Sequence, residues 1–334
     1  MLILAVVAAL VSPFALLLRV LHVDDPLIFA ALSALDGFKS FVADLVIWLL
    51  FGFILVAVFL IIKGRIERCR IYSAEHVVDV PTNSSPKSMV VVLTAYNDEE
   101  AVRKVVPEFL AQKMVKEVIV VDNNSRDATG KVAMELGARV VYESQQGYGY
   151  ACIRGLREAL KNTDAEVIVL AEGDGTFAAK DLRKFEAYID QADMVLGTRV
   201  DPVLTDRGSQ MDYFFTWGNK FLATLIRLRF WDTRFYGVAR LTDVGCTYRA
   251  IRREALEKII DDLKVGGNHF SPHMIMVALS HKLRVVEIPI TFKRRIGESK
   301  GASRSLWRGL KVGLAMLWHI MNYRASASNK EHSK

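Results

Sequence analysis

Two acidic side chains follow a short apolar run near the middle of the chain. Glu172 and Asp174 stand one residue apart after residues 167–170, and the segment turns at Gly175. Carboxylate oxygens suit hard cations such as Mg²⁺ or Mn²⁺, which bind through one or two carboxylates together with phosphate oxygens. The pattern therefore predicts a divalent-metal site that receives a phosphorylated ligand.

The elements that position these acids alternate between strand and helix. The strand-like runs are apolar along most of their length, at residues 89–95, 115–122, 138–143 and 165–174. Helix-like stretches separate them, at residues 98–113, 125–137 and 147–162. Such a pattern is typical of a parallel sheet covered on both faces. We predict an α/β fold with a doubly wound, mostly parallel sheet.

Polar clusters follow three of the predicted strands, at residues 94–99, 122–125 and 172–174. Ligands of doubly wound sheets bind at the carboxyl ends of the strands. Residues 122–125 have a simpler interpretation as a helix cap, but three clusters at three strand ends favour one binding site. The chain has neither a G-x-G-x-x-G turn after its first strand nor a Walker lysine. A bound nucleotide would therefore need a metal to neutralise its phosphates.

Two uncharged segments account for the excess of apolar residues. The chain has 334 residues, of which 51% are hydrophobic. Residues 1–18 and 45–62 each have the length of a membrane-spanning helix, although a signal peptide is the alternative for the first. Basic residues follow the second segment directly, namely Lys63, Arg65, Arg68 and Arg70. The positive-inside rule then places the rest of the chain in the cytoplasm.

The C-terminal segment, residues 303–334, is basic and amphipathic. Its apolar residues recur mostly three and four apart, namely Trp307, Leu310, Leu314, Leu317, Trp318 and Met321. Such a pattern predicts a helix in the membrane interface, and contact with the globular body of the chain is the alternative. The net charge of +7 therefore indicates attraction to anionic lipid and not nucleic-acid binding. The three cysteines, Cys69, Cys152 and Cys246, form no metal-spaced pair and are expected to be reduced.

Six ordered motifs between residues 89 and 300 resemble glycosyltransferase family 2. The family's P-x-Y-N-E, D-D-x-S-x-D-x-T and D-x-D motifs have counterparts in TAYND (94–98), DNNSRDAT (122–129) and EGD (172–174). Further motifs are GTR (197–199), DVGCTYRAIRREAL (243–256) and EIPITFKRRIGESK (287–300). The resemblance is to the branch that contains dolichol-phosphate mannose synthase and bacterial polyprenyl-phosphate glycosyltransferases. It covers about two thirds of the chain.

This resemblance implies the GT-A fold and an inverting, metal-dependent transfer of a sugar from a UDP- or GDP-sugar to a polyprenyl phosphate. Such a product would feed cell-envelope glycan or glycoconjugate assembly. The implied donor-binding residues are Thr94, Tyr96, Asn97, Asp98, Asp122, Asn124, Glu172, Gly173 and Arg199. Glu172 and Asp174 would hold Mg²⁺ or Mn²⁺. The acceptor phosphate would contact Arg249, Arg295, Ser299 and Lys300, and the implied catalytic residues are Asp174, Asp243 and Arg295.

The acceptor decides which of these residues the chemistry needs. A phosphate monoester is largely dianionic at neutral pH, so it needs guiding more than deprotonating, and arginine forks match its oxygens. A hydroxyl acceptor would need a base, for which Asp243 is the candidate. Pairing with acids or exposure to solvent is the alternative for Arg199 and Arg249. Contacts within the protein or helix capping are the favoured interpretation of His269 and His273.

The sequence departs from the family pattern at several positions, namely Thr94, Asn123, Glu172, Cys246, Thr247 and His273. Two other functions stay open: transfer to a lipid-linked saccharide or lipid hydroxyl, and a non-catalytic membrane scaffold. No Q-x-x-R-W follows the body, which argues against a processive polysaccharide synthase.

Taken as a whole, the sequence predicts an integral protein of a bacterial inner membrane with a cytoplasmic catalytic domain. The predicted parts are a two-helix transmembrane region (1–62), a linker (63–88), a GT-A domain (89–302) and an interfacial helix with a basic tail (303–334). The sequence specifies neither the sugar nor the oligomeric state, and a homo-oligomer is left open.

Overall fold

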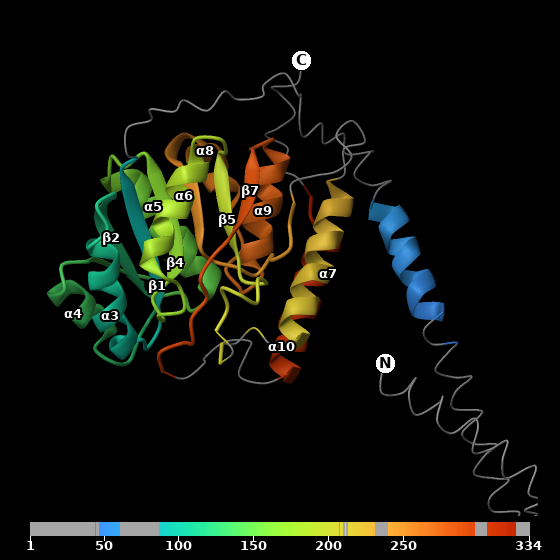
Figure 1. The fold of residues 1–334 in the computed structure, drawn as a ribbon, viewed down its shortest axis with the longest axis horizontal. Coiled ribbons are helices and arrows are strands. Elements are labelled where there is room, and N and C mark those ends of the chain that lie inside the picture. Colours follow the sequence, from blue (N-terminus) through green and yellow to red (C-terminus); the bar gives the residue numbers. More distant parts are fainter. Residues whose placement is uncertain are drawn as a thin grey trace, which may run out of the picture. The chain divides into compact units, whose positions relative to one another are not determined.

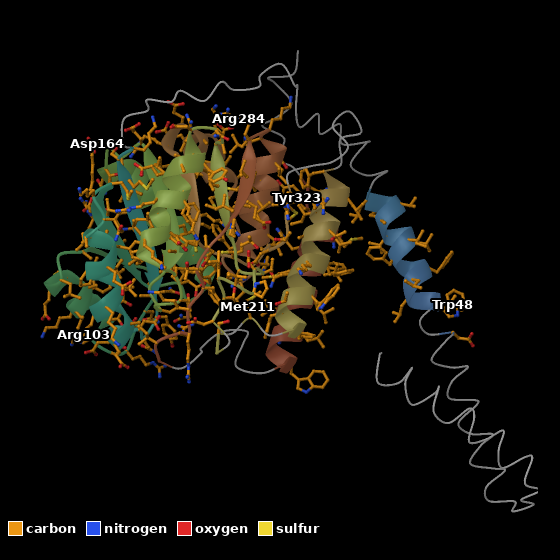
Figure 2. All side chains as sticks on the ribbon, viewed as in Figure 1. Trp48, Arg103, Asp164, Met211, Arg284 and Tyr323 are labelled. Carbon is orange, nitrogen blue, oxygen red and sulfur yellow. The ribbon has the colours of Figure 1, made fainter. Side chains whose placement is uncertain are left out.

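The computed structural model describes residues 44, 47–60, 87–206, 208–209, 211, 213–230, 240–297 and 306–324. The chain divides into two compact units, Met1–Phe59 and Leu60–Lys334. In the first unit, residues 47–59 are helical, and Trp48 is 70% exposed (Figure 2). Among the described residues, no helix combines the length and apolar character needed to cross a membrane. The predicted span at 1–18 and most of the predicted linker lie outside the described residues.

The second unit is built on one mixed, mostly parallel sheet of seven strands in the order β3-β2-β1-β4-β6-β5-β7. Its strands are β1 (Met89–Ala95), β2 (Val115–Asp122), β3 (Arg139–Tyr142), β4 (Val167–Glu172), β5 (Met194–Thr198), β6 (Arg249–Arg252) and β7 (Val285–Pro289). Only β6 among them runs antiparallel to its neighbours. The α/β prediction is confirmed, and β1 to β4 fall within the four strand-like runs.

Helices cover both faces of this sheet (Figure 1). They are α3 (Glu99–Leu110), α4 (Thr129–Glu135), α5 (Tyr148–Asn162), α6 (Leu182–Ile189), α7 (Tyr213–Arg229), α8 (Arg253–Ile259), α9 (Phe270–Ser280) and α10 (Leu306–Asn322). Alternate residues of β1 explain the two layers. Val91 joins a buried cluster with Val105 of α3 and Phe185 of α6, whereas Val92 faces Gly155 of α5.

The strand register gathers the predicted polar clusters at one edge of the sheet. Thr94 on β1 pairs with Glu172 on β4, and Ala95 pairs with Asp122 on β2. Because the three strands are parallel, their carboxyl ends lie side by side. The loops that follow turn sharply through Asn97 and Asn124, whose φ angles of 51° and 65° are left-handed. Asparagine tolerates this region better than most residues.

The predicted C-terminal helix is present as α10, which lies beside α7 and also contacts α9 (Figure 1). Arg229 at the end of α7 donates from Nη2 to the backbone oxygen of Tyr323 at 2.6 Å. The Tyr323 hydroxyl, labelled in Figure 2, lies 3.0 Å from the Ser280 hydroxyl of α9. Contact with the catalytic body, the alternative for this segment, is therefore confirmed, while its place in a membrane interface stays a prediction.

Candidate active site

A pocket of about 560 Å³ opens at the carboxyl ends of β1 and β4 and continues between α7 and α10. Its polar end is lined by many of the residues that the sequence singled out, namely Thr94, Tyr96, Asp98, Glu172, Asp174, Arg199 and Arg295. Its apolar end is lined by side chains of the two helices. The pocket thus joins a charged region to a hydrocarbon-like one.

Arg295 connects two acids at the polar end. Its Nη1 lies 3.1 Å from Asp174 Oδ2, and its Nη2 lies 3.1 Å from Asp98 Oδ1. The segment around it is held against the Asp174 loop, because the amide of Ile296 donates to the backbone oxygen of Asp174 at 3.0 Å. The side chain of Arg295 is only 13% exposed. Its guanidinium therefore lies between Asp98, a predicted donor-binding residue, and Asp174, a predicted metal ligand, while its role towards an acceptor phosphate stays a prediction.

Asp174 and Glu172 are the two acids of the predicted metal site. Asp174 Oδ1 accepts hydrogen bonds from the Thr176 amide at 3.0 Å and the Thr176 hydroxyl at 2.6 Å. Burial, together with the charge of Asp174, raises the pKa of Glu172 to about 8. A cation between the two carboxylates would favour the charged form of both.

The two acids fit Mg²⁺ or Mn²⁺ that takes its other ligands from phosphate and water. Among the described residues, no group of three or more His, Cys, Asp or Glu side chains could hold a metal on its own. The pocket therefore offers two carboxylates, Glu172 and Asp174, and a metal ion bound there would need further oxygen ligands from a phosphate or from water.

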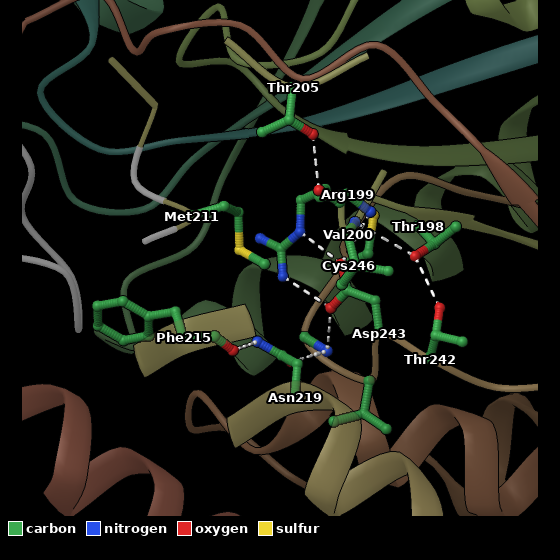
Figure 3. Close-up of polar contacts among 12 residues, drawn as sticks. Thr198, Arg199, Val200, Thr205, Met211, Phe215, Asn219, Thr242, Asp243 and Cys246 are labelled. Carbon is green, nitrogen blue, oxygen red and sulfur yellow. Dashed lines mark hydrogen bonds and ion pairs between the residues drawn. The ribbon is translucent and has the colours of Figure 1, made fainter. Parts of the chain in front are cut away.

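Arg199 and Asp243 form a buried bidentate pair (Figure 3). Arg199 donates from Nε to Asp243 Oδ2 at 2.8 Å and from Nη2 to Oδ1 at 2.9 Å. Burial alone would raise the pKa of Asp243, but the Arg199 guanidinium outweighs it and holds this pKa below its ordinary value. The alternative of an acid partner is confirmed for Arg199. A carboxylate stabilised in its charged form is a weak general base, which disfavours that role for Asp243.

The loop that carries Asp243 is held from two sides. Glu287 on β7 accepts the backbone amides of Thr242 and Asp243, each at 2.9 Å. Asn219 of α7 accepts the amide of Gly245 at 2.9 Å (Figure 3). Helix α7 is thus connected directly to the loop that holds the Arg199 guanidinium.

Arg249 lies outside the pocket. It is 1% exposed, and its guanidinium donates to the backbone oxygens of Cys246 at 2.9 Å, Ser271 at 2.7 Å and Val244 at 3.3 Å. Burial lowers the pKa of Arg249. The structure therefore does not bring this predicted phosphate ligand to the site, because its donors hold the chain around β6 together. Ser299 and Lys300 lie outside the described residues.

Several residues that were predicted to bind the nucleotide-sugar donor form hydrogen bonds within the loops behind the pocket. Asp122 accepts the amide of Ser125 at 2.9 Å. The Asn97 amide donates to the Ser125 hydroxyl at 3.0 Å, and the amide of Gly173 donates to the Thr94 backbone oxygen at 2.9 Å. Asn124 supplies the left-handed turn between them. The residues that line this pocket do not include Asn97, Asp122, Asn124 or Gly173.

Asn123 shows why the second acid of its motif is replaced. Its amide nitrogen donates to the backbone oxygens of Glu143 at 3.1 Å and Gln145 at 2.7 Å. Its amide oxygen accepts the Gly147 amide at 2.9 Å. A carboxylate has no N–H to donate, so an aspartate here would face two carbonyl oxygens. Asn123 therefore fixes the start of α5 beside the pocket.

The histidines near α9 contact one another. His273 Nδ1 lies 3.0 Å from His319 Nε2, and His273 Nε2 lies 3.1 Å from the backbone oxygen of Asp262. The ring of His269 lies 5.0 Å from that of His319. For His273 the interpretation as a contact within the protein is confirmed, since the residue joins α9 to α10.

The apolar end combines residues of the predicted C-terminal helix with residues on and near α7 that the sequence analysis did not single out. Its lining residues on and just before α7 are Met211, Phe214, Phe215, Phe221 and Leu222, and those of α10 include Leu310, Leu314, Met316 and Leu317. Exposed apolar side chains are frequent here, with Leu314 at 56% and Phe214 at 44%. The aromatic-rich run at residues 213–221 was the available signal for α7.

Comparison with known proteins agrees with this geometry. Residues 90–260, just over half of the chain, match the family described as Glycosyl transferase family 2. The chain belongs to glycosyltransferase family 2. The predicted resemblance is thereby confirmed.

Two relatives of this family 2 protein carry names that specify a lipid phosphate. Polyprenol monophosphomannose synthase of Mycolicibacterium smegmatis is 29% identical over 66% of this chain and 84% of its own length. Undecaprenyl-phosphate mannosyltransferase of Micrococcus luteus is 28% identical over 71% of this chain and 98% of its own length.

A solved structure supports the fold. Glucosyl-3-phosphoglycerate synthase from Mycobacterium tuberculosis, in complex with Mn²⁺, UDP and phosphoglyceric acid, gives a TM-score of 0.52 at 18% identity. The match covers 72% of this chain and 80% of that one. At this identity the likeness establishes the arrangement of the sheet and helices, which is GT-A-like, and no more.

Proposed function

We propose that the protein transfers a sugar from a nucleoside-diphosphate sugar to a polyprenyl phosphate. The observation that carries this proposal is one continuous pocket, because it joins the acids and arginines at the strand ends to the apolar space between α7 and α10. The family membership supports sugar transfer, and the names of the relatives support the choice of a lipid phosphate as acceptor.

The polar end would bind the donor. Mg²⁺ or Mn²⁺ held by Glu172 and Asp174 would stabilise the charge that develops on the leaving diphosphate. Tyr96 lines the same end, where its ring would stack on the nucleobase. Arg199 is fixed by Asp243, so its guanidinium is held in place for a phosphate oxygen before the ligand arrives.

The apolar end would bind the acceptor lipid. A hydrocarbon chain placed along Phe214, Phe221 and Leu314 would remove their exposed surface from water, which is favourable. The head-group phosphate would then lie towards Arg295, the arginine that lines the polar end near the acids. A dianionic phosphate can attack the sugar without a general base, which agrees with the paired state of Asp243.

Membrane attachment is part of the proposal. The uncharged segments at 1–18 and 45–62 and the basic residues after the second one support an integral protein with its catalytic domain in the cytoplasm. This topology would give the pocket access to lipid in the cytoplasmic leaflet. A cysteine introduced in the catalytic domain, such as Lys104→Cys, should react with a membrane-impermeant maleimide only after the cells are permeabilised.

The test of transfer uses the detergent-purified protein with Mn²⁺, polyprenyl phosphate and a panel of UDP-, GDP- and dTDP-sugars. Mass spectrometry of the extracted lipid should show one glycosyl-phosphate product with one donor, and Asp174→Asn should not form it. Nucleotide binding without any lipid product would contradict the proposal that polyprenyl phosphate is the acceptor. Failure to bind any nucleotide with Mn²⁺ would favour the scaffold alternative.

A further inference from the structure

The acids that fit a divalent cation are already contacted by a cation of the chain. Arg295 lies 3.1 Å from Asp174 Oδ2 and 3.1 Å from Asp98 Oδ1. Both carboxylates are buried, at 3% and 6% side-chain exposure. A metal ion that binds Asp174 through Oδ2 must therefore take this oxygen from the guanidinium.

We propose that Arg295 is a mobile counter-ion that competes with the divalent metal for Asp174 and moves to a phosphate oxygen when a phosphorylated substrate enters. This inference rests on the proposed function. It concerns the order of binding, because the metal alone has to break the contact between Arg295 and Asp174. A phosphate that arrives with the metal offers Arg295 a new partner.

The hydrogen bonds of Asp174 explain why a metal ion would displace the Arg295 guanidinium. Oδ1 already accepts two hydrogen bonds from Thr176, at 3.0 and 2.6 Å, so Oδ2 is the oxygen that faces a ligand. Two cations close to one carboxylate oxygen repel each other strongly where the dielectric constant is low. Binding of the metal at Oδ2 therefore moves the guanidinium away from this atom.

The surrounding loop fixes the backbone on both sides of Arg295, while the guanidinium reaches the pocket. Its neighbours are held by backbone hydrogen bonds, from Lys293 to the Thr176 oxygen at 2.8 Å and from Ile296 to the Asp174 oxygen at 3.0 Å. The guanidinium lines the pocket, and its Nε has no hydrogen-bond partner. In the proposed movement, the Arg295 side chain changes rotamer and turns from the acids towards a phosphate while its backbone stays in place.

The expected signature is positive coupling between metal and phosphate. If one ligand removes a contact that opposes the other, each raises the affinity of the other by the same factor. In the wild type, Mn²⁺ alone should bind weakly, and the phosphorylated ligand to which Arg295 moves should increase the Mn²⁺ affinity. In Arg295→Ala, Mn²⁺ alone should bind about 10-fold more tightly or better, the scale of one lost charge-assisted contact, and the same ligand should increase the Mn²⁺ affinity by a smaller factor.

The measurement is a Mn²⁺ titration of the full-length protein, followed by electron paramagnetic resonance of the free ion. It is made with no additive, with UDP or GDP, and with polyprenyl phosphate in detergent. The additive that loses its coupling in Arg295→Ala identifies the phosphate to which Arg295 moves. Arg294→Ala is the matched control. Arg294 is exposed, and its substitution removes the same charge from the same loop while Asp98 and Asp174 keep their contacts with Arg295.

The outcomes separate this inference from the proposed function. Tighter Mn²⁺ binding and reduced coupling in Arg295→Ala, but not in Arg294→Ala, would support the competition. Equal Mn²⁺ affinity and equal coupling in wild type and Arg295→Ala would overturn it while leaving the metal site intact. If Mn²⁺ binds to no variant with or without nucleotide, both the competition and the metal-dependent transfer are wrong. Thermal melting in EDTA checks that each variant is folded.

Discussion

The polar and apolar ends of the pocket differ in how their side chains are held. At the polar end, Arg199 is fixed by two hydrogen bonds to Asp243, and Arg295 lies between two acids. At the apolar end, side chains such as Leu314 and Phe214 remain about half exposed. Apart from the movement proposed for Arg295, the polar end is thus organised before a ligand arrives, whereas burial of the apolar end requires an occupant.

This difference assigns different tasks to the two ends. Fixed charges stabilise developing charge without the cost of reorganisation, so they control the rate. Apolar surface gives affinity in proportion to the area removed from water. Substitutions at the polar end should therefore reduce turnover, and substitutions at the apolar end should raise the KM for the lipid.

The largest effect is expected for Asp174→Ala. Removal of a fixed charge stabiliser lowers the rate by about 100-fold or more, so transfer should fall to background. EDTA should abolish transfer by the wild type in the same way. Glu172→Asp should reduce the transfer rate less than Asp174→Ala does, because it restores the family's residue. Asp164→Ala, at an exposed acid, is the control. Normal turnover by Asp174→Ala would show that the polar end does not control the rate.

Arg295→Ala tests whether the polar end also guides the acceptor. A charge-assisted contact to phosphate contributes about 1.5–3 kcal/mol, so use of polyprenyl phosphate should weaken by roughly 10- to 150-fold. Lysine should rescue it only in part, because the bidentate fork is lost. The readout is kcat/KM for the lipid at saturating donor. An unchanged lipid KM with impaired donor use would assign Arg295 to the diphosphate.

Leu314→Glu tests the apolar end directly. A charge on this wall of the pocket should raise the KM for polyprenyl phosphate by about 10-fold, since burial of one leucine contributes about 1.5–3 kcal/mol. Nucleotide affinity, measured without lipid, should stay unchanged. Met134→Glu alters an exposed apolar residue of α4 and should have no effect. If both variants behave alike, the space between α7 and α10 does not bind the lipid.

The smallest effect concerns pH. Burial raises the pKa of Glu172 to about 8 from an ordinary value of 4.5. The contribution of the protonated carboxyl to the free energy of unfolding is therefore complete below pH 4.5 and is lost as the pH rises through 8. Glu172→Gln should therefore lose less thermal stability than the wild type between pH 5.5 and 8.5. Each difference of ~1 kcal/mol shifts Tm by about 2–4 °C. Glu135→Gln, at an exposed position, should follow the wild type; an identical pH profile for Glu172→Gln would contradict the shift.

The sequence predicted the parts of the fold that depend on local pattern. Apolar runs that alternate with helix-like stretches predicted β1 to β4, and the polar residues that follow these runs predicted the strand ends. This pattern was enough to place Glu172 near Thr94 at one edge of the sheet, with Asp174 just beyond it. The antiparallel strand β6 could not be predicted in this way. Its position between β4 and β5 is a long-range pairing, which a local pattern does not determine.

The site was predicted less completely, for the same reason. An arginine in a family motif can face a ligand or hold the protein together, and only the surroundings decide. Arg199 and Arg249 are both arginines of family motifs, yet Arg199 lines the pocket and Arg249 donates to three backbone oxygens. The apolar end depends on contact between α7 and α10, which are far apart in the sequence.

The most direct measurement compares three acceptors with the donor that proves active. They are a long-chain polyprenyl phosphate, the same polyprenol without phosphate, and a short-chain prenyl phosphate. If both ends of the pocket act together, only the long-chain phosphate should be glycosylated efficiently, with the other two at least ~10-fold poorer in kcat/KM, the scale of one lost contact of ~1.4 kcal/mol. Equal use of the free polyprenol would contradict the account, because a hydroxyl acceptor would then need the base that Asp243, paired with Arg199, does not provide.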